Sequence, residues 1–424
     1  MTAPDTTGGK TPAPSRTGSG ERSQEGGETE GGQKTTPLLE VHRRLGATLT
    51  SFAGWLMPLR YASETDEHNA VRRAAGLFDL SHMGEISVTG PAAGAALDYA
   101  LTGHLSTVEP GRARYTMICA ADGGVLDDLV AYRLADDEYF VVANAANAGL
   151  VYQELTKRAA GHDVAVRDVS LDYALIAIQG PNAAAILSRR TGFPSSASLA
   201  ELKYYASLRA VIGGTPVLLA RTGYTGEDGF ELFCPPDHAV SVWNALAEAG
   251  AGDGLIPAGL CARDTLRLEA GMPLYGNELS RDITPFEAGL GRVVKFDKPG
   301  DFVGREALAA RALAGPGSRL IGLIGRSRRI PRHGHRVLLD GQVIGTVTSG
   351  APSPTLGRPI AMAYVRPDAV DAAAAAGTPR AVGAAASART AAQTAAGAGR
   401  LAIDVRGQAE PADYVQLPFY RRAK

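Results

Sequence analysis

The sequence predicts an α+β protein in which a mixed core of helices and antiparallel strands is followed by a small all-β domain. Two observations predict the mixed core. From Leu38 onward short strand-like runs alternate with helical stretches, and turn residues join several of these runs into hairpins. A third observation predicts the all-β domain, because beyond about Gly315 the chain consists of short strands separated by turn signals. The length of 424 residues and the 45% hydrophobic content suit two or three domains.

Residues 1–35 are predicted to form a disordered tail. After Met1, residues 2–37 contain no Leu, Ile, Val, Phe, Tyr or Trp and are rich in Gly, Thr, Ser, Pro and Glu. Such a segment buries too little apolar surface to offset the entropy that is lost on ordering. Its acidic residues and its lack of apolar periodicity also argue against a mitochondrial transit peptide.

The mixed core is predicted over residues 36–312. In chain order its elements are strands at 129–134 and 138–144 joined across Asp136 and Asp137, a strand, a Gly180-Pro181 turn and a helix at 173–187, a hairpin at 209–214 and 216–221, and helices at 239–250 and 261–271. β-rich runs joined by a short turn favour antiparallel pairing. Gly250 and Gly271 are typical of helix ends.

Residues 318–424 are predicted to form a small β-barrel or sandwich. Its strands are expected at 319–325, 335–350, 360–365, 401–407 and 414–420. Asp340 and Gly341 are typical of a type I′ hairpin turn within the second of these segments. The Ala-rich tract at 367–400 is interrupted by glycine and proline, so we expect an extended loop there and not a helix.

Charge and cysteine content exclude several classes of function. Lys and Arg total 43 against 44 for Asp and Glu, and neither half carries the basic stripe that nucleic acid or an anionic membrane requires. Cys119, Cys234 and Cys261 are too few and too widely spaced for a disulfide framework or a thiolate metal site, which suggests a reducing, cytoplasmic environment. No apolar run approaches the roughly 20 residues of a membrane span.

Nucleotide and metal motifs are also absent from the sequence. There is no Gly-x-Gly-x-x-Gly and no Walker lysine loop, and the Gly-rich segment 223–229 has a different spacing. His333 and His335 lie two residues apart, but Arg332 and Arg336 flank them, and cationic neighbours oppose metal binding. We therefore expect no metal site.

A pair of acids, Asp127 and Asp128, opens a predicted strand after a Gly-Gly turn. Alternation places Asp128 on the same face as Val130 and Tyr132 and Asp127 on the other, so one acid of the pair can face a given pocket. Because Asp128 heads an apolar and aromatic row, burial would raise its pKa and suit it to proton transfer. The alternative is that both acids are solvated residues at a strand end.

A second candidate group lies later in the chain. Tyr224 is on a Gly-flanked loop, and Glu231 begins a strand seven positions on. Arg263 and Arg267 are four residues apart on a predicted helix. Taken alone, the first pair is equally compatible with an ordinary loop and hairpin, and the arginines with surface ion pairs.

Ten sequence blocks together carry a resemblance. They are TPLLEVHRRLGA, FAGWLMPLRY, EHNAVRRAAGLFDLSHMGE, GGVLDDLVAYR, ALIAIQGPNA, RTGYTGEDGFEL, GLCARDTLRLEAGMPLYGNEL, TPFEAGLG, FVGREAL and TSGAPSPTLGRPIAMAYV. On these residues the chain resembles the glycine cleavage T-protein family over residues 36–366 and 401–424. The resemblance implies two intertwined, mixed α/β domains with antiparallel sheets that share a folate site, and a C-terminal β-barrel. The first 35 residues and the Ala-rich tract depart from the family pattern.

The resemblance also implies an activity. Members of this family are aminomethyltransferases of the glycine cleavage system, which move a one-carbon unit from the aminomethyl-lipoyl H-protein to tetrahydrofolate. Ammonia and 5,10-methylenetetrahydrofolate are formed. Tetrahydrofolate would then be the co-substrate, no metal would be needed, the lipoylated H-protein would be a transient partner, and the P- and L-proteins would be linked indirectly.

Site residues follow from the same resemblance. It assigns Asp128 as the catalytic carboxylate, and Glu231 and Arg263 as the pair that binds the pterin edge. The remaining positions implied for the folate pocket are Tyr115, Tyr204, Tyr224, Met83, Val130, Tyr132 and Asn144.

Two other functions compete with this one. A related enzyme could move a methyl group from sarcosine, dimethylglycine or a sulfonium compound to the same folate. The flavin-linked relatives usually carry a dinucleotide-binding domain, for which this chain has neither the length nor the glycine motif. A folate-binding accessory protein would share the fold but is expected to lack the catalytic carboxylate, and Asp128 is present.

Overall fold

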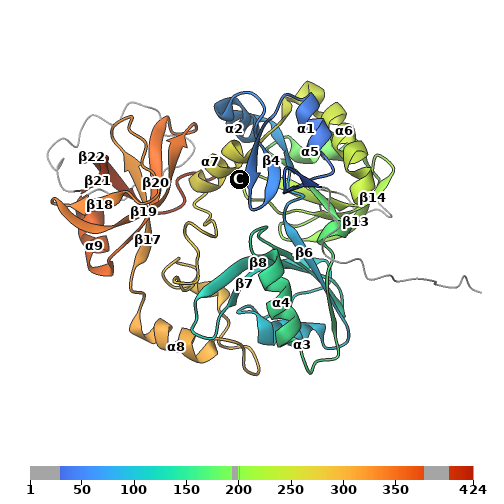
Figure 1. The fold of residues 1–424 in the computed structure, drawn as a ribbon, viewed down its shortest axis with the longest axis horizontal. Helices are drawn as coiled ribbons and strands as arrows, with labels where there is room; N and C mark the ends of the chain where they lie inside the picture. The colour runs from blue at the N-terminus through green and yellow to red at the C-terminus, as the bar shows by residue number, and fades with distance from the viewer. Residues whose placement is uncertain (1–28, 193–198, 200, 377–400, 424) are drawn as a thin grey trace, which may run out of the picture.

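The computed structural model has three lobes, and the helix α7 (Leu260–Glu269) lies at the edge of one of them, facing the barrel (Figure 1). The structure describes residues 29–192, 199, 201–376 and 401–423. Two lobes are mixed α/β units, and the third is the barrel, which Figure 1 shows beside α7. The C-terminus lies close to α7 and not at the far end of the barrel. The α+β fold class that the sequence predicts is confirmed.

The first α/β unit is built on an antiparallel five-stranded sheet of order β10-β6-β9-β8-β7. Its elements are β6 (Gly84–Thr89), α3 (Ala93–Ala100), β7 (Arg112–Cys119), β8 (Val125–Ala135), β9 (Glu138–Ala143), α4 (Ala148–Arg158) and β10 (Ala165–Asp168). Apolar side chains of alternate strand positions, such as Ile86 and Val88, pack against Leu97 of α3 and Leu155 of α4. The predicted antiparallel pairing of β8 and β9 is confirmed.

The second unit is built on a seven-stranded sheet of order β12-β13-β14-β15-β11-β5-β16. Its elements are α1 (Leu39–Arg44), α2 (Glu64–Arg73), β5 (Ala75–Asp79), β11 (Ala174–Gln179), α5 (Ala183–Ser188), β12 (Thr191–Gly192), β13 (Ser207–Ile212), β14 (Thr215–Ala220), β15 (Gly229–Cys234), α6 (Ala239–Gly250), β16 (Leu255–Pro257) and α7. β5 precedes the first unit in the chain and β11 follows it, so the two units are intertwined.

The strand, turn and helix predicted at 173–187 are confirmed as β11 and α5, and the hairpin predicted at 209–221 is confirmed as β13 and β14. The two predicted helices are α6 and α7. Short 3-10 helices occur at Ser170–Asp172, Pro236–His238, Ala251–Asp253 and Gly291–Val293.

The prediction of a disordered tail up to residue 35 is wrong for its last residues. β1 (Thr29–Glu30) and β2 (Gln33–Thr35) join β4 (Trp55–Arg60) and β3 (Thr48–Phe52) in a four-stranded sheet. The backbone N–H of Lys34 donates to the carbonyl of Gly54, and its ammonium lies 5.5 Å from the ring centroid of Trp55. Backbone pairing holds this segment although it has no apolar side chain. Residues 1–28 lie outside the described part of the chain.

The third lobe is a closed barrel of order β17-β20-β19-β18-β21-β22, which decides between the barrel and the sandwich. Its elements are β17 (Arg319–Gly325), β18 (Arg336–Leu339), β19 (Gln342–Ser353), β20 (Arg358–Val365), β21 (Leu401–Val405) and β22 (Gln408–Val415), and α8 (Arg305–Ala314) leads into it. Asp340 and Gly341 both have positive φ, of 50° and 80°, as the predicted type I′ turn requires.

Two predictions for the barrel are corrected. The start of the Ala-rich tract is a helix, α9 (Pro367–Ala376), because alanine is the best helix former and proline is favoured in the first turn. Ala369 and Val370 anchor it in the barrel core, whereas residues 377–400 lie outside the described part. The last predicted strand ends at Val415, and the chain then leaves the barrel toward α7.

A buried carboxylate at the end of α7 holds several elements together. Glu269 Oε2 lies 3.1 Å from His68 Nε2 and 2.9 Å from Arg72 Nη2, and both partners belong to α2. From the barrel, Thr355 Oγ1 donates to the same carboxylate at 2.7 Å. The backbone N–H of Tyr420, near the C-terminus, donates to the carbonyl of Glu269 at 2.8 Å. Glu269 therefore ties α2, α7, the barrel and the C-terminal segment to one point.

We predict that Glu269→Gln strongly destabilises the protein. Burial opposes ionisation of Glu269, but the hydrogen bond and charge of His68 and the charge of Arg72 lower its pKa from 4.5 to about 2. A carboxyl group whose pKa is lowered in the folded state stabilises the fold at any pH above its unfolded-state pKa of about 4.5. This stabilisation is lost as the pH falls from about 4.5 to about 2. The expected loss at pH 7 is ~3 kcal/mol in the free energy of unfolding.

Urea unfolding of Glu269→Gln and of the wild-type protein between pH 3 and pH 7 measures this effect, with the exposed Glu306→Gln on α8 as the control. The difference between wild type and variant should shrink as the pH falls. An equal difference at both pH values would contradict the assignment.

Candidate active site

Asp127 and Asp128 are neighbours on β8 with different surroundings. The Asp127 carboxylate is fully buried and accepts hydrogen bonds from the backbone N–H of Asn144 at 2.9 Å, from Asn144 Nδ2 at 2.9 Å and from Asn147 Nδ2 at 2.7 Å. Asp128 is half-buried as a residue, and its carboxylate accepts from Tyr115 Oη at 3.0 Å and from Asn144 Nδ2 at 2.8 Å. Asp128 is therefore the acid that can touch a substrate, and Asp127 orients Asn144.

Electrostatics around the two acids favour the protonated forms. Burial raises the pKa of both carboxyl groups, and the charge of Asp128 raises that of Asp127 further. The hydrogen bonds from Tyr115 and Asn144 counteract part of the rise at Asp128. Because the acids influence each other, the pair takes up protons as a unit. The raised pKa that the strand pattern predicts for Asp128 agrees with this direction.

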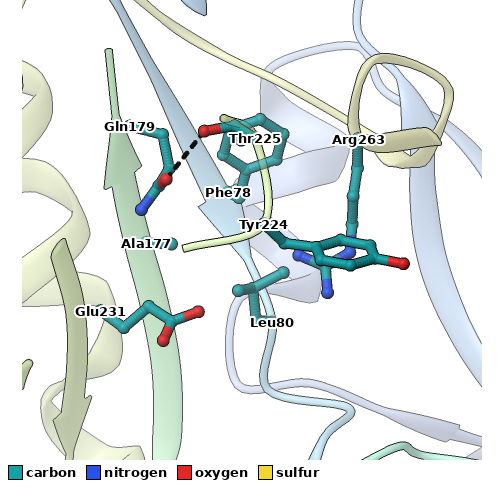
Figure 2. Close-up of a pocket in the computed structure, with 8 residues that line it drawn as sticks. All are labelled: Phe78, Leu80, Ala177, Gln179, Tyr224, Thr225, Glu231 and Arg263. Carbon is teal, nitrogen blue, oxygen red and sulfur yellow. Dashed lines mark hydrogen bonds between the residues drawn. The ribbon is translucent and has the colours of Figure 1, made fainter. Parts of the chain in front are cut away.

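A second group of predicted residues meets around a small cavity of about 10 Å³ on the other α/β unit. The cavity is lined by Phe78, Leu80, Ala177, Gln179, Tyr224, Thr225, Glu231 and Arg263. Figure 2 shows the carboxylate of Glu231 pointing from β15 toward Tyr224 and Arg263, which lie one over the other. Acceptor oxygens on one side and a guanidinium on the other suit the edges of a flat, polar ring.

The loop before β15 places Tyr224 over Arg263. Gly226 has a φ of 82°, and a Cβ there would meet the Cβ of Ala270 at 2.9 Å, so glycine allows the loop to pack directly on α7. The Arg263 guanidinium carbon lies 4.8 Å from the Tyr224 ring centroid, and Tyr224 Oη donates to the carbonyl of Pro273. The aromatic ring is therefore held at both ends.

Tyr132 connects the two groups across the units. It extends from β8, and its hydroxyl lies 3.0 Å from Thr222 Oγ1 and 3.4 Å from Glu231 Oε2. Thr222 also donates to the Glu231 carboxylate. Burial raises the pKa of Glu231, while Thr222, Arg263 and Tyr132 counteract the rise. The strand that carries Asp128 thus also reaches the cavity of Glu231.

Met83 and Val130 pack with Tyr132 in the apolar core between the two units, beside the cavity. Tyr204 is placed differently from the other predicted residues. Its side chain is 43% exposed, and the guanidinium of Arg422 lies 5.9 Å from its ring centroid.

Tyr205 is a further candidate site residue that the sequence does not indicate. Its pKa is raised by burial, by Tyr204 and by the charges of Glu231 and Asp128, so it lies within the field of both carboxylates. Its φ of 59° is unusual for an aromatic residue, and strained backbone of this kind clusters at functional sites. The backbone of Tyr205 also pairs with Ala113 of β7 and with Arg221. No local pattern distinguishes Tyr205 from Tyr204 in the sequence.

Two buried polar atoms near the site, His82 Nδ1 and Glu85 Oε1, have no hydrogen-bond partner among the described residues. Burial and then the charge of Arg263 lower the pKa of His82 to about 3, so its ring is neutral. Burial and then the charges of Asp168 and Glu231 raise the pKa of Glu85 well above its ordinary value. Burial therefore favours the uncharged form of both groups.

Within the described part of the chain, no group of three or more His, Cys, Asp or Glu side chains is arranged to hold a metal ion. His333 Nδ1 lies 2.9 Å from the Thr348 carbonyl, and His335 Nδ1 accepts from the backbone of Arg332. Across the same residues, none of the helices has both the length and the apolar character to span a membrane.

The fold and site together define a class: a three-lobed α+β protein with a pair of adjacent acids on one unit and a small cavity lined by a carboxylate and a guanidinium on the other. Comparison with known proteins gives the family. Residues 38–298 match the GCVT N-terminal domain, and residues 319–421 match the glycine cleavage T-protein C-terminal barrel domain. The chain belongs to the glycine cleavage T-protein family, as the sequence blocks indicate.

Similar proteins cover nearly the whole chain. An aminomethyltransferase of Streptomyces coelicolor is 58% identical over 394 residues, which span 92% of this chain and 98% of the relative. An aminomethyltransferase of Geobacillus kaustophilus is 43% identical over 92% of this chain and 100% of the relative. The crystal structure of glycine cleavage system aminomethyltransferase T from Bartonella henselae matches with a TM-score of 0.78 and 35% identity, over 91% of this chain and 98% of that one.

We predict that Glu85→Gln stabilises the protein increasingly as the pH rises. A carboxyl group whose pKa is raised in the folded state does not reduce stability below its unfolded-state pKa of about 4.5. As the pH rises from there toward the folded-state pKa, the free energy of unfolding falls. Glutamine carries no such penalty. Thermal unfolding should give nearly equal midpoints at pH 5, and a midpoint at least about 3 °C higher for the variant at pH 8.

Glu109→Gln, at an exposed position, is the control for this comparison. A midpoint difference that does not grow with pH would show that Glu85 ionises freely in the folded protein.

Proposed function

We propose that this protein is the aminomethyltransferase of a glycine cleavage system. It would take the aminomethyl group from the lipoyl arm of the H-protein and transfer the carbon to tetrahydrofolate. Ammonia, the reduced lipoyl arm and 5,10-methylenetetrahydrofolate would be the products. The proposed enzyme class agrees with the names of the full-length relatives. The observation that carries the proposal is the Asp128 carboxylate, held by Tyr115 and Asn144 on the strand whose Tyr132 reaches Glu231, which lines one cavity with Arg263.

The chemistry needs a carboxylate at the reacting carbon. The carbon–nitrogen bond of the aminomethyl group breaks and ammonia leaves, so the carbon stays on the lipoyl sulfur as a thionium-like cation that one folate amine attacks. The carbon–sulfur bond then breaks as the second folate amine closes the methylene bridge, and the two protons that the folate amines lose go finally to ammonia and to the lipoyl thiol. Asp128 in its ionised form stabilises the cation and accepts the proton that the folate amine loses. The hydrogen bonds from Tyr115 and Asn144 fix its orientation. Holding donor and acceptor in register supplies a further part of the rate.

Glu231 and Arg263 are proposed to bind the pterin of the folate. The carboxylate accepts hydrogen bonds from adjacent N–H donors of the ring, and the guanidinium donates to its carbonyl oxygen. Tyr224 is placed to pack on the flat ring, because Arg263 and the carbonyl of Pro273 fix its orientation. Tyr132, Met83 and Val130 would close the apolar side of the same pocket.

The partners and compartment are part of this proposal. We infer that the lipoylated H-protein is a transient partner, that the P- and L-proteins act through it, and that the reaction takes place in the cytoplasm. A related enzyme with another methyl donor would use the same folate pocket, so the donor must be tested directly.

Release of ammonia and methylenetetrahydrofolate from purified protein, tetrahydrofolate and aminomethyl-loaded H-protein tests the donor. Stoichiometric release of both products supports the proposal. Folate binding without release would point to another methyl donor or to a non-enzymatic folate-binding protein.

We predict that Asp128→Asn retains folate binding and loses transfer. Asparagine keeps the shape and can still bond to Tyr115, but it carries no charge and accepts no proton, so the rate should fall by about 100-fold or more. Asp136→Asn, in the exposed turn after β8, is the matched control. Calorimetric folate titration and single-turnover product release measure the two effects. Full transfer activity in Asp128→Asn would refute the catalytic assignment.

We also predict that Tyr115→Phe shifts the pH dependence of transfer. The Tyr115 hydroxyl stabilises the ionised form of Asp128, so its removal should raise the pKa of that carboxyl further. The acid limb of the rate profile should move to higher pH, with near wild-type rates on the alkaline plateau. A uniform loss of rate at every pH would instead indicate a role in substrate positioning.

A further inference from the structure

A second and larger cavity, of about 190 Å³, opens on the opposite face of the second unit. It lies between α1, α6 and β16, and its walls are Val41, Arg44, Leu45, Leu77, Trp243, Asn244, Ala247, Leu255, Ile256 and Pro257. This volume is below the ~300–1,000 Å³ typical of sites for drug-sized ligands, so the cavity suits a more compact molecule. The proposed transferase mechanism uses none of these residues.

The interior of this cavity is apolar and rigid. Val41, Leu77 and Trp243 are buried. The Trp243 ring packs against the edge of His42 with 5.7 Å between centroids, and His42 Nε2 is held 2.8 Å from the carboxylate of Asp79. The tryptophan wall is therefore fixed before any ligand arrives, which reduces the entropy lost on binding.

The polar groups of the cavity are at its rim. Arg44, on α1, is exposed and forms no ion pair with any residue that the structure describes, whereas its neighbour Arg43 pairs with Glu40 and Glu30. The side chain of Asn244, on α6, is exposed and likewise has no hydrogen bond within the described ranges. A cation and an amide without partners thus stand at the mouth of an apolar cavity.

From this arrangement we propose that the cavity binds a small monocarboxylate with a compact apolar body. The body would fill the space beside Trp243, and the carboxylate would accept hydrogen bonds from Arg44 and Asn244. An α-amino acid fits less well, because its ammonium group would lie close to Arg44 and no acidic side chain lines the cavity.

The cavity is separate from the candidate active site. Alternation along β5 points Leu77 into this cavity, whereas Phe78 and Leu80 line the cavity of Glu231 on the other face of the sheet. Binding at Arg44 can therefore be tested whether or not the chain transfers aminomethyl groups, and failure of one proposal leaves the other intact.

Phenylacetate and its uncharged isostere phenylacetamide are the probes. The chain has two tryptophans, so the Trp55→Phe protein reports binding through the fluorescence of Trp243 alone. Phenylacetate should bind saturably, and at least about 10-fold more tightly than phenylacetamide, because a charged hydrogen bond to Arg44 distinguishes them. Arg44→Gln should remove this preference, and Arg43→Gln, one residue away, should retain it.

Ala247→Phe fills the cavity and provides the second variant. It should abolish the Trp243 response to phenylacetate while far-ultraviolet circular dichroism and the folate affinity remain those of the parent protein. No saturation by phenylacetate in the parent protein, or equal affinity in parent and Arg44→Gln proteins, would overturn the proposal.

Discussion

The geometry of the molecule depends on the buried carboxylate of Glu269. It is the last residue of α7 and accepts contacts from α2 through His68 and Arg72 and from the barrel through Ser353 and Thr355. The same helix carries Arg263, six residues earlier, into the candidate active site. A buried carboxylate is tolerated because every side of it meets a donor, and removal of one donor leaves a desolvated charge. Helix, barrel and site are thereby fixed together.

The candidate site shows how two identical side chains acquire different tasks. Asp127 is enclosed by donors from Asn144 and Asn147, whereas Asp128 is half-buried and accepts from Tyr115 and Asn144. Burial raises the pKa of both carboxyl groups, but both oxygens of Asp127 already accept hydrogen bonds from Asn144 or Asn147. Asn144 donates to both acids, so Asp127 helps to set the position of the Asp128 carboxylate through their shared donor. The hydrogen-bond partners of the Asp128 carboxylate therefore come from β7 and from the end of β9, the two strands beside β8.

The sequence predicted the local elements well and the tertiary contacts between them less well. Alternation on β8 selected Asp128, and the Asp340-Gly341 pair marked a hairpin, because both depend on neighbours in sequence. The strand at Gln33–Thr35 was missed because it has no apolar side chain and is held by backbone pairing with β4. Tyr205 was missed because its backbone pairs with Ala113, about 90 residues earlier in the chain. Its left-handed backbone conformation also leaves no mark in the sequence. Family resemblance supplied the roles of Glu231 and Arg263.

The placement of β5 also governs the order in which the chain can fold. β5 ends at Asp79, and its neighbours in the sheet begin at Ala174 and Leu255. The strands of the first unit all lie between them in sequence, so on the ribosome that sheet can close while β5 still lacks both partners. Closing the long loop afterwards carries an entropic penalty and makes this pairing a late event. A nascent chain would thus expose the apolar edge of β5, and a chaperone that recognises extended apolar segments would find its target there.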